Sequence, residues 1–285
     1  MGIEQNKRSV LDTGISSDEV RGAYERLRQI IEGYGSVAVA FSGGVDSGLL
    51  AFVAWDVLGD RMLSVLGISP SFPKREEEAA IEFLTRHGIP FERIETNEIQ
   101  NKHYRRNNPD RCYHCKSELF GKIRRVASDR GFSVVAYGSN LDDGADYRPG
   151  EVAAGENQVV APLVEAGLNK NTVRELARGL GLLLWDKPAS PCLASRIPYF
   201  EEVTIEKLAQ IEAAENVLKD LGLKICRVRH HGNLARIETP VEDHTRLLRD
   251  GVWERIVERL KTIGFEYVTL DLEGFRSGRL NDVLG

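Results

Sequence analysis

The chain has 285 residues, of which 42% are hydrophobic and 28% charged, and its formal net charge is −5. This length allows one large or two modest domains, each with its own core. An acidic chain argues against indiscriminate nucleic-acid binding, which needs a basic surface, and no apolar run of about 18 residues is present to span a membrane. The N-terminal segment has no apolar core of a signal peptide, so we expect a cytoplasmic protein without nucleic-acid or membrane partners.

Helices and strands alternate along the first part of the chain. Apolar residues at helical spacing predict helices, and short apolar runs predict buried strands between them. The helices are expected at 17–33, 48–59, 75–88, 115–131 and 169–182, and the strands at 36–41, 61–69, 90–97 and 132–140. This alternation predicts an α/β domain built on a doubly wound parallel sheet.

The pattern changes after a proline-broken segment at 186–200. We place a domain boundary at its end and expect domains at 1–200 and 201–285. Beyond the boundary the sequence predicts a helix at 204–222, two strands around a His-Gly-Asn turn at 224–239, a mostly helical stretch at 246–264 and a last strand at 265–273. This order is typical of a small α+β domain.

The hexapeptide Ser-Gly-Gly-Val-Asp-Ser at 42–47 connects the first predicted strand to the following helix. Such a connection lies at the carboxyl edge of a parallel sheet, where open α/β folds bind ligands. Gly43 and Gly44 allow the backbone to approach a ligand closely, and the first amide groups of the helix attract anions. The glycine spacing fits neither a Walker loop nor a dinucleotide fingerprint. A tight turn without a ligand is the alternative.

This hexapeptide resembles the PP-loop of the ATP pyrophosphatase family, whose domain is similar to the adenine nucleotide alpha hydrolases. The resemblance implies that ATP is cleaved between its α and β phosphates, that pyrophosphate leaves, and that an acceptor oxygen becomes adenylylated. Asp46 would help to position Mg²⁺. Ser69 and Gly138 follow two other predicted strands and are further candidates at the same edge. The expected ATP-binding residues are therefore Ser42, Gly43, Gly44, Asp46, Ser47, Ser69 and Gly138.

The cysteines carry the second chemical signal. Cys112 and Cys115 form a C-x-x-C pair, and Cys192 lies in a proline-rich loop that is a poor core position. A C-x-x-C pair can bind a metal or a cluster, or undergo redox chemistry. Three thiolates suit a 4Fe–4S cluster with one open iron, whereas zinc would need a fourth ligand such as Cys226 or His114. Cys226 lies in an apolar strand and is interpreted as a structural residue.

Further stretches over about residues 35–282 resemble the LarE family of ATP-dependent sulfur transferases: NPDRCYHCKSELF, GSNLDDGADYRPG, KPASPCLASRIPY, RVRHH, ARIE and TLDLEGFRSGRLND. The resemblance implies that the carboxylates of pyridinium-3,5-biscarboxylic acid mononucleotide are adenylylated and converted to thiocarboxylates. This step belongs to synthesis of the nickel-pincer cofactor of lactate racemase. The resemblance also implies a sulfide donor and a homo-oligomer whose C-terminal domain binds substrate or joins protomers.

The LarE family has two versions. One gives up the sulfur of a cysteine in the region of Cys192, and the other holds a 4Fe–4S cluster on three cysteines. Cys112 and Cys115 are present, so the chain resembles the cluster version, with Cys112, Cys115 and Cys192 as the implied ligands. Ser195 and Arg196 follow the third cysteine and are expected to hold a substrate carboxylate. The expected catalytic residues are Asp46, Cys192, Ser195 and Arg196.

A substrate with a phosphate and carboxylates needs cationic partners. Arg227 and Arg229 alternate on one predicted strand and therefore face the same side, as a phosphate clamp requires. Arg276 and Arg279 in the glycine-containing tail are further substrate-binding candidates. Solvated surface charges are the alternative for each of these arginines.

Three other functions stay open. A tRNA thiolase also combines a PP-loop with cysteines, although the acidic chain shows no RNA-binding module. An ATP-dependent amide synthetase or amidotransferase would have no use for three cysteines, and no glutaminase domain is visible. A non-catalytic cluster-binding nucleotide sensor would bind ATP without turnover. Glu215 and Glu238 are left as either ligand contacts or partners of other charges.

Overall fold

The computed structural model describes residues 17–145, 149–276 and 278–284. The N-terminal segment without a signal peptide, residues 146–148 of the GSNLDDGADYRPG motif, and Ser277 of the C-terminal motif lie outside the described residues. The described chain divides into two compact units. The first comprises 17–69, 74–97, 112–145 and 149–190, and the second comprises 70–73, 98–111, 191–276 and 278–284. Residues 191–200 thus pack with the second unit, although the boundary was expected at residue 200.

The first unit contains a sheet of four parallel strands. They are β1 (Val37–Phe41), β2 (Met62–Ile68), β3 (Phe91–Glu95) and β4 (Val134–Tyr137), in the order β3-β2-β1-β4. The chain proceeds outward from β1 to β3 and then crosses to the other side of β1 for β4, so the sheet is doubly wound. Every residue of β1 is buried, as expected of a strand covered on both faces. The predicted α/β class is confirmed.

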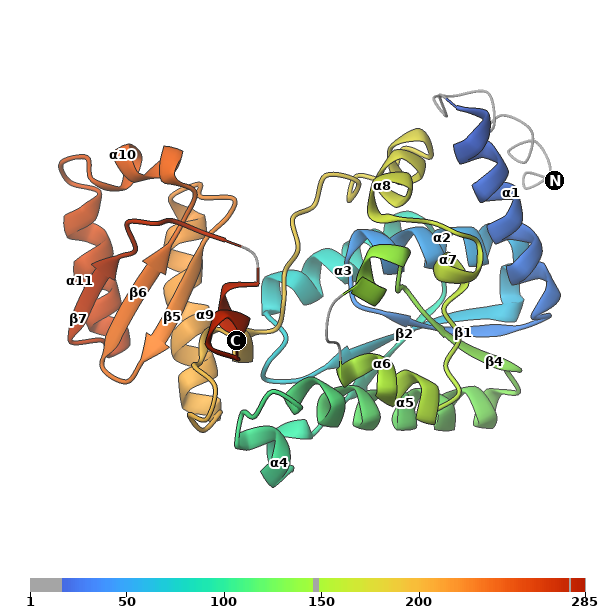
Figure 1. The fold of residues 1–285 in the computed structure, drawn as a ribbon, viewed down its shortest axis with the longest axis horizontal. Coiled ribbons are helices and arrows are strands. Elements are labelled where there is room, and N and C mark those ends of the chain that lie inside the picture. Colours follow the sequence, from blue (N-terminus) through green and yellow to red (C-terminus); the bar gives the residue numbers. More distant parts are fainter. Residues whose placement is uncertain (1–16, 146–148, 277, 285) are drawn as a thin grey trace. The chain divides into compact units, whose positions relative to one another are not determined.

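Helices cover both faces of this sheet (Figure 1). On one face, Ala38 and Ala40 of β1 belong to the same core cluster as Phe120. On the other face, the Phe41 ring stacks on Phe83 with 5.9 Å between centroids. The helices of this unit are α1 (Asp18–Gly33), α2 (Val45–Leu58), α3 (Lys74–Arg86), α5 (Arg111–Arg130, whose first residue belongs to the second unit), α6 (Pro149–Glu156), α7 (Pro162–Glu165) and α8 (Lys170–Gly179).

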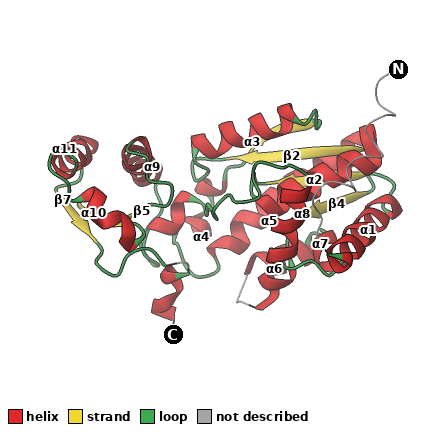
Figure 2. Ribbon diagram, turned by 90° about the horizontal axis from the view of Figure 1, so that it is seen from above, coloured by secondary structure: helices red, strands yellow, loops and turns green. Residues whose placement is uncertain are grey.

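The second unit contains a mixed sheet of three strands, β5 (Arg227–His231), β6 (Leu234–Glu238) and β7 (Tyr267–Leu270). β5 and β6 are antiparallel, whereas β6 and β7 are parallel. Helices α9 (Ile205–Asp220) and α11 (Trp253–Ile263) lie side by side on one face (Figure 2). The remaining short helices are α4 (Lys102–Arg105) and α10 (His244–Leu247). The predicted small α+β domain is confirmed.

Two helices begin earlier than the sequence predicts. The helix expected at 48–59 begins at Val45, because Gly44 caps it without any side-chain hydrogen bond and so leaves no signal in the sequence. Asp46 and Ser47 therefore lie in its first turn. The helix expected at 115–131 begins at Arg111, so both cysteines of the C-x-x-C pair are helical.

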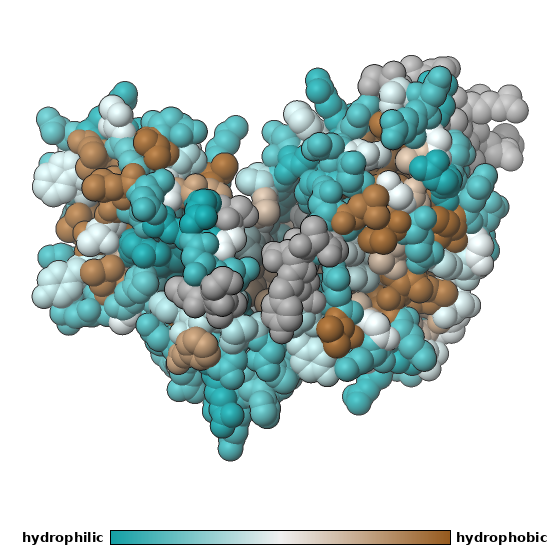
Figure 3. Space-filling view, viewed as in Figure 1, coloured by the Kyte–Doolittle hydropathy of each residue, from teal (hydrophilic) through white to brown (hydrophobic). Residues whose placement is uncertain are grey.

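The surface is mixed in polarity. On the face seen in Figure 3, hydrophobic residues are scattered among hydrophilic ones. Within the part of the chain that the structure describes, no helix is both long enough and apolar enough to cross a membrane.

Candidate functional site

The Ser42–Ser47 loop follows β1 at the carboxyl edge of the first unit's sheet. β1 lies between β2 and β4, so the loop is at the point where the strand order reverses, which is where open α/β sheets bind ligands. Gly43 has a φ of +72°, and a Cβ added to it would lie 3.0 Å from the Cβ of Ala80 on α3. Glycine is required there for both backbone conformation and space.

The two serine hydroxyls close this loop. The Oγ atoms of Ser42 and Ser47 are 3.1 Å apart, and the Ser47 hydroxyl donates to the carbonyl oxygen of Gly44 at 3.2 Å. The backbone N–H of Ser42 donates to Ser47 Oγ at 3.2 Å. The first amide groups of α2 have no partner inside the helix, so the loop and helix together offer N–H donors to a phosphate.

Gly138 lies directly against the loop. A Cβ at this position would be 2.6 Å from the backbone nitrogen of Ser47 and 2.8 Å from the carbonyl carbon of Asp46. The structure therefore brings Gly138, which follows β4, to the PP-loop as the sequence predicts. Ser69 follows β2, the neighbouring strand on the other side of β1. Their contacts with ATP stay a prediction.

Asp46 has two partners that the sequence did not indicate. Its carboxylate accepts from Asn140 Nδ2 at 3.0 Å and forms an ion pair with Lys170 at the start of α8. The Lys170 backbone N–H is in turn fixed by Asp142 at 2.9 Å. Asn140 belongs to a motif already singled out, but nothing in the sequence marks Lys170.

A second lysine reaches the loop. Lys187 Nζ donates to the carbonyl oxygen of Gly43 at 2.8 Å and lies 2.8 Å from a carboxylate oxygen of Glu76. Two lysines from distant parts of the chain thus lie at one glycine-rich loop. Such a site can balance the charge of a polyphosphate.

Cys112 and Cys115 lie in the first turn of α5. Residues three apart on a helix share a face, and all four cysteines are free thiols, with Cys112 exposed and Cys115 half-buried. The spacing therefore allows both sulfurs to bind one group. They belong to the first unit and Cys192 to the second. Among the described residues, no three His, Cys, Asp or Glu side chains form a group that could hold a metal, so the three-cysteine cluster stays a prediction.

The half-buried Cys192 precedes a short 3-10 helix, Leu193–Arg196, which Arg196 holds in place. Its Nη1 atom donates to the carbonyl oxygens of Pro191 at 2.6 Å and Cys192 at 3.0 Å, and to Ser195 Oγ at 2.9 Å. Its Nε and Nη2 atoms donate to the two carboxylate oxygens of Glu215 at 2.8 and 3.0 Å. Both side chains of this pair are at least 98% buried.

This geometry gives Arg196 a positioning role around Cys192. Direct contact of Ser195 or Arg196 with a substrate carboxylate stays a prediction.

Arg111 ties the start of α5 to the Cys192 loop. This buried residue directly precedes Cys112, and its Nη1 atom donates to the carbonyl oxygen of Ala194 at 2.9 Å and to the side-chain oxygen of Asn107. Asn107 Nδ2 donates to the carbonyl oxygens of Ile197 and Pro198 at 3.2 and 2.7 Å. The residue next to one predicted cluster ligand is therefore bonded to the loop that carries another.

Comparison with known proteins identifies the family. No protein-family model matches the chain. It is 45% identical over 260 residues to an uncharacterized protein of Synechocystis sp., covering 91% of this chain and 97% of the relative. It is 39% identical over 249 residues to the pyridinium-3,5-bisthiocarboxylic acid mononucleotide synthase of Lactiplantibacillus plantarum, covering 87% and 90%. The chain belongs to the LarE family.

A more distant relation of this LarE protein is to a glutamine-hydrolyzing GMP synthase of Methanococcus maripaludis. The identity is 29% over 221 residues, which is 72% of this chain and 67% of the relative.

The predicted phosphate clamp of this LarE protein is buried and already paired. Arg229 donates from Nε and Nη2 to one carboxylate oxygen of Glu238 at 3.0 and 2.9 Å, and from Nη1 to the carbonyl oxygen of Ser195 at 2.7 Å. Arg227 donates to the carbonyl oxygen of Cys226 at 2.7 Å and lies over the ring of Phe275. Burial, reinforced by the charge of Arg196, lowers the pKa of Arg227. A phosphate role for the pair stays a prediction.

The tail arginines also have acidic partners. Arg279 lies 3.1 Å from Asp271 and 2.5 Å from Glu273, while the exposed Arg276 pairs with Asp282. Asp271 also lies 3.4 Å from Arg236. These contacts join the tail to β6 and β7 and leave the substrate-binding prediction untested.

The remaining acidic and sulfur groups have structural partners. Glu215 and Glu238 are the buried carboxylates of the Arg196 and Arg229 pairs. Cys226 is fully buried in the core of the second unit. Burial, together with the charge of Glu215, raises the pKa of its thiol to about 11, so Cys226 stays a neutral, unreactive thiol near neutral pH.

Proposed function

We propose that this LarE protein is an ATP-dependent sulfurtransferase. Its substrate would be pyridinium-3,5-biscarboxylic acid mononucleotide, whose carboxylates it adenylylates and converts to thiocarboxylates for the nickel-pincer cofactor of lactate racemase. The observation that carries the proposal is the PP-loop at the centre of the sheet edge, with two lysines beside it, in a chain 39% identical to a bisthiocarboxylic acid mononucleotide synthase.

The loop would perform the activation step. The loop amides, Lys170 and Lys187 hold the phosphates of ATP, and Asp46 helps to position Mg²⁺. A substrate carboxylate oxygen attacks the α-phosphorus, the bond to the bridging oxygen breaks, and pyrophosphate leaves. Activation is needed because a carboxylate oxygen is a poor leaving group, whereas AMP leaves readily from the resulting acyl adenylate.

Sulfur then replaces that oxygen. Hydrosulfide attacks the acyl carbon, AMP departs with the former carboxylate oxygen, and a thiocarboxylate and a proton remain. Cys112, Cys115 and Cys192 would hold a 4Fe–4S cluster, which would supply an iron able to carry the sulfide. Arg196 fixes the backbone of the Cys192 loop, and the Arg111 contact joins that loop to the start of α5.

Substrate binding would fall to the second unit. Arg227, Arg229, Arg276 and Arg279 offer charge to the phosphate and carboxylates, and Ser195 offers a hydroxyl. We further propose a cytoplasmic homo-oligomer that acts on a small molecule, uses a separate sulfide donor and has no nucleic-acid or membrane partner.

The test is an anaerobic reaction with ATP, Mg²⁺, sulfide and the pyridinium dicarboxylate. We expect AMP and pyrophosphate in equal amounts and a product heavier by one sulfur-for-oxygen exchange for each carboxylate. Thiolation of tRNA without reaction of the dicarboxylate would instead support the tRNA thiolase. ATP binding without pyrophosphate release would support a nucleotide sensor.

The relation to a GMP synthase keeps an amidotransferase as a second candidate, at lower identity and coverage. Ammonia in place of sulfide separates the two, because an amidotransferase would then form the amide product.

A further inference from the structure

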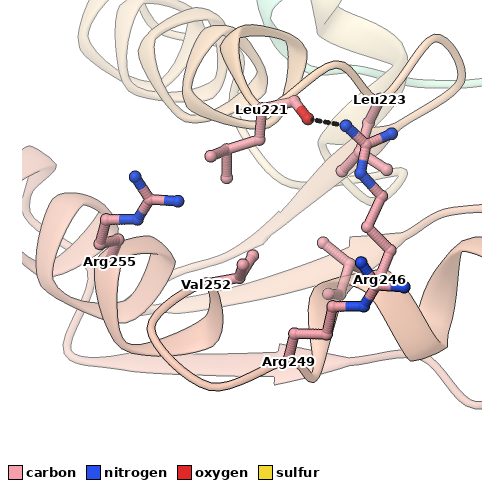
Figure 4. A pocket seen from close by; sticks show the side chains of 7 residues that line it. Leu221, Leu223, Arg246, Arg249, Val252 and Arg255 are labelled. Carbon is pink, nitrogen blue, oxygen red and sulfur yellow. Dashed lines mark hydrogen bonds between the residues drawn. The ribbon is translucent and has the colours of Figure 1, made fainter.

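A hollow in the second unit lies among residues to which no function has been assigned. Its cavity volume is about 390 Å³, and it is lined by Lys102, Arg105, Arg106, Asn108, Phe200 and Glu202. This volume is in the range of small-molecule sites, which are roughly 300–1,000 Å³. A second hollow, beneath Arg246, Arg249 and Arg255, is smaller at about 170 Å³, and Arg246 donates there to the carbonyl oxygen of Leu221 at the end of α9 (Figure 4).

Phe200 is held in an unusual position beside the larger hollow. Its φ is +69°, a conformation that costs free energy for a bulky side chain. Its residue surface is 70% exposed, so core packing of the ring does not offset that cost. A strained residue that presents an aromatic ring to solvent is typical of a binding site.

Fixed contacts maintain this backbone. The Phe200 N–H donates to the carbonyl oxygen of Asn107 at 3.1 Å. Asn107 itself has a φ of +53°, is fully buried, and bonds through its side chain to Ile197, Pro198 and Arg111. Two residues in left-handed conformations thus support each other, and the ring is held before any ligand arrives.

The charge around the ring is positive. Lys102 and Arg106 are exposed, and neither has a carboxylate partner within the described ranges of the chain. Arg105 lies 3.2 Å from Glu202, the one acidic residue in the lining. Three cations and one carboxylate beside an exposed ring favour a ligand that is both aromatic and anionic.

We infer that this hollow binds a heteroaromatic nucleotide. The base or pyridinium ring stacks on Phe200, and the phosphate pairs with Lys102 and Arg106. The ligand could be a pyridinium mononucleotide, the class of the proposed substrate, or an adenine nucleotide, and both share this chemistry. The inference does not depend on the proposed function, because binding is measured without turnover.

Calorimetric titration of the full chain with nicotinic acid mononucleotide, and separately with AMP, tests the inference. Phe200→Gly removes the ring, and glycine adopts the same φ without strain, so the unfolding temperature should not fall. We expect nucleotide binding about tenfold weaker, as for loss of one base–aromatic stack. Arg106→Gln should weaken binding several-fold, while Arg259→Gln, an exposed cation on α11, should leave it unchanged.

The outcomes separate the possible ligands. Loss of binding in both Phe200→Gly and Arg106→Gln supports the inference, and the nucleotide with the lower Kd identifies the source. Nucleotide bound at the PP-loop is unaffected by these two substitutions. Unchanged affinity in both variants overturns the inference. Inorganic phosphate that binds as tightly as either nucleotide also overturns it, as does a single-stranded RNA that binds when neither mononucleotide does.

Discussion

At the scale of single residues, glycines fix the shape of the candidate ATP site. Gly43 meets two demands at once, a positive φ and close approach to α3, whereas Gly138 answers only to space. Its α-carbon lies so near the first turn of α2 that a methyl group would overlap backbone atoms of Asp46 and Ser47. Backbone cannot rotate away as a side chain can, so these contacts determine how closely β4 approaches the loop.

Gly138→Ala should therefore disturb the loop. We expect a loss of about 1–3 kcal/mol in the free energy of unfolding, as for overpacked positions, together with weaker ATP binding. Urea unfolding and nucleotide titration measure the two effects. Gly121→Ala on α5 is the control, because its new Cβ would meet nothing within 4 Å. Equal behaviour of the two variants would contradict the steric account.

At the scale of elements, buried ion pairs join the Cys192 loop to the second unit's core. Glu215 on α9 binds both Arg196 and the backbone N–H of Val228 on β5, the latter at 3.1 Å. Glu238 on β6 binds Arg229, which reaches the carbonyl oxygen of Ser195. A helix and two strands thus determine the course of one short segment, and this explains why arginines predicted to bind substrate also have structural partners.

Glu215→Gln should be strongly destabilising. It leaves the Arg196 charge buried without its counter-ion, which typically costs about 3–5 kcal/mol. The exposed pair of Arg276 and Asp282 provides the matched comparison, and Arg276→Gln should cost roughly 0–1 kcal/mol. Urea unfolding followed by circular dichroism gives both values. A loss below 1 kcal/mol for Glu215→Gln would contradict a structural role for the pair.

The link between α5 and the Cys192 loop leads to a prediction for cluster assembly. Arg111→Lys keeps the charge but cannot reproduce the planar set of donors that reaches Ala194 and Asn107. If the three cysteines hold a 4Fe–4S cluster, iron affinity should fall about tenfold, as for other residues that orient metal ligands. Iron analysis after anaerobic reconstitution measures it.

Arg130→Gln at the far end of α5 is the control for that experiment, since Arg130 makes a single ion pair with Glu92. Full iron loading of the Arg111 variant, with its fold intact, would contradict the positioning role.

At the scale of the whole molecule, two units have separate cores. One core lies beneath the parallel sheet and the other between α9, α11 and the mixed sheet. The PP-loop residues belong entirely to the first unit, whereas Cys192 and the candidate substrate arginines belong to the second. Activation and substrate binding are therefore assigned to different units.

Mg²⁺-ATP should stabilise the first unit selectively. Ligand at 100 times its Kd adds about 2.7 kcal/mol, which raises the unfolding temperature of a unit this size by roughly 5 °C or more. We expect scanning calorimetry to show two transitions, of which only one moves. Asp46→Asn should abolish that shift. A single transition that moves as a whole would contradict independent cores.

The sequence by itself determined the fold class, the order of elements and the position of the PP-loop. Each depends on local patterns: apolar periodicity, strand ends and glycine punctuation. Cys226 was also interpreted correctly as structural, because an apolar strand surrounds it. Motifs spread along the chain indicated the LarE family, which the relatives confirm.

Only the tertiary structure decided which charged groups meet. Lys170 and Lys187 reach the loop from 124 and 144 residues away, and nothing near them in the sequence resembles a phosphate-binding motif. Arg196 looked like a substrate contact until Glu215 was found against it. The start of α2 was also hidden, because Gly44 caps it without a side chain. The physical reason is that local periodicity fixes where elements begin and which face is apolar, whereas charge pairing depends on strand order and packing across the whole unit.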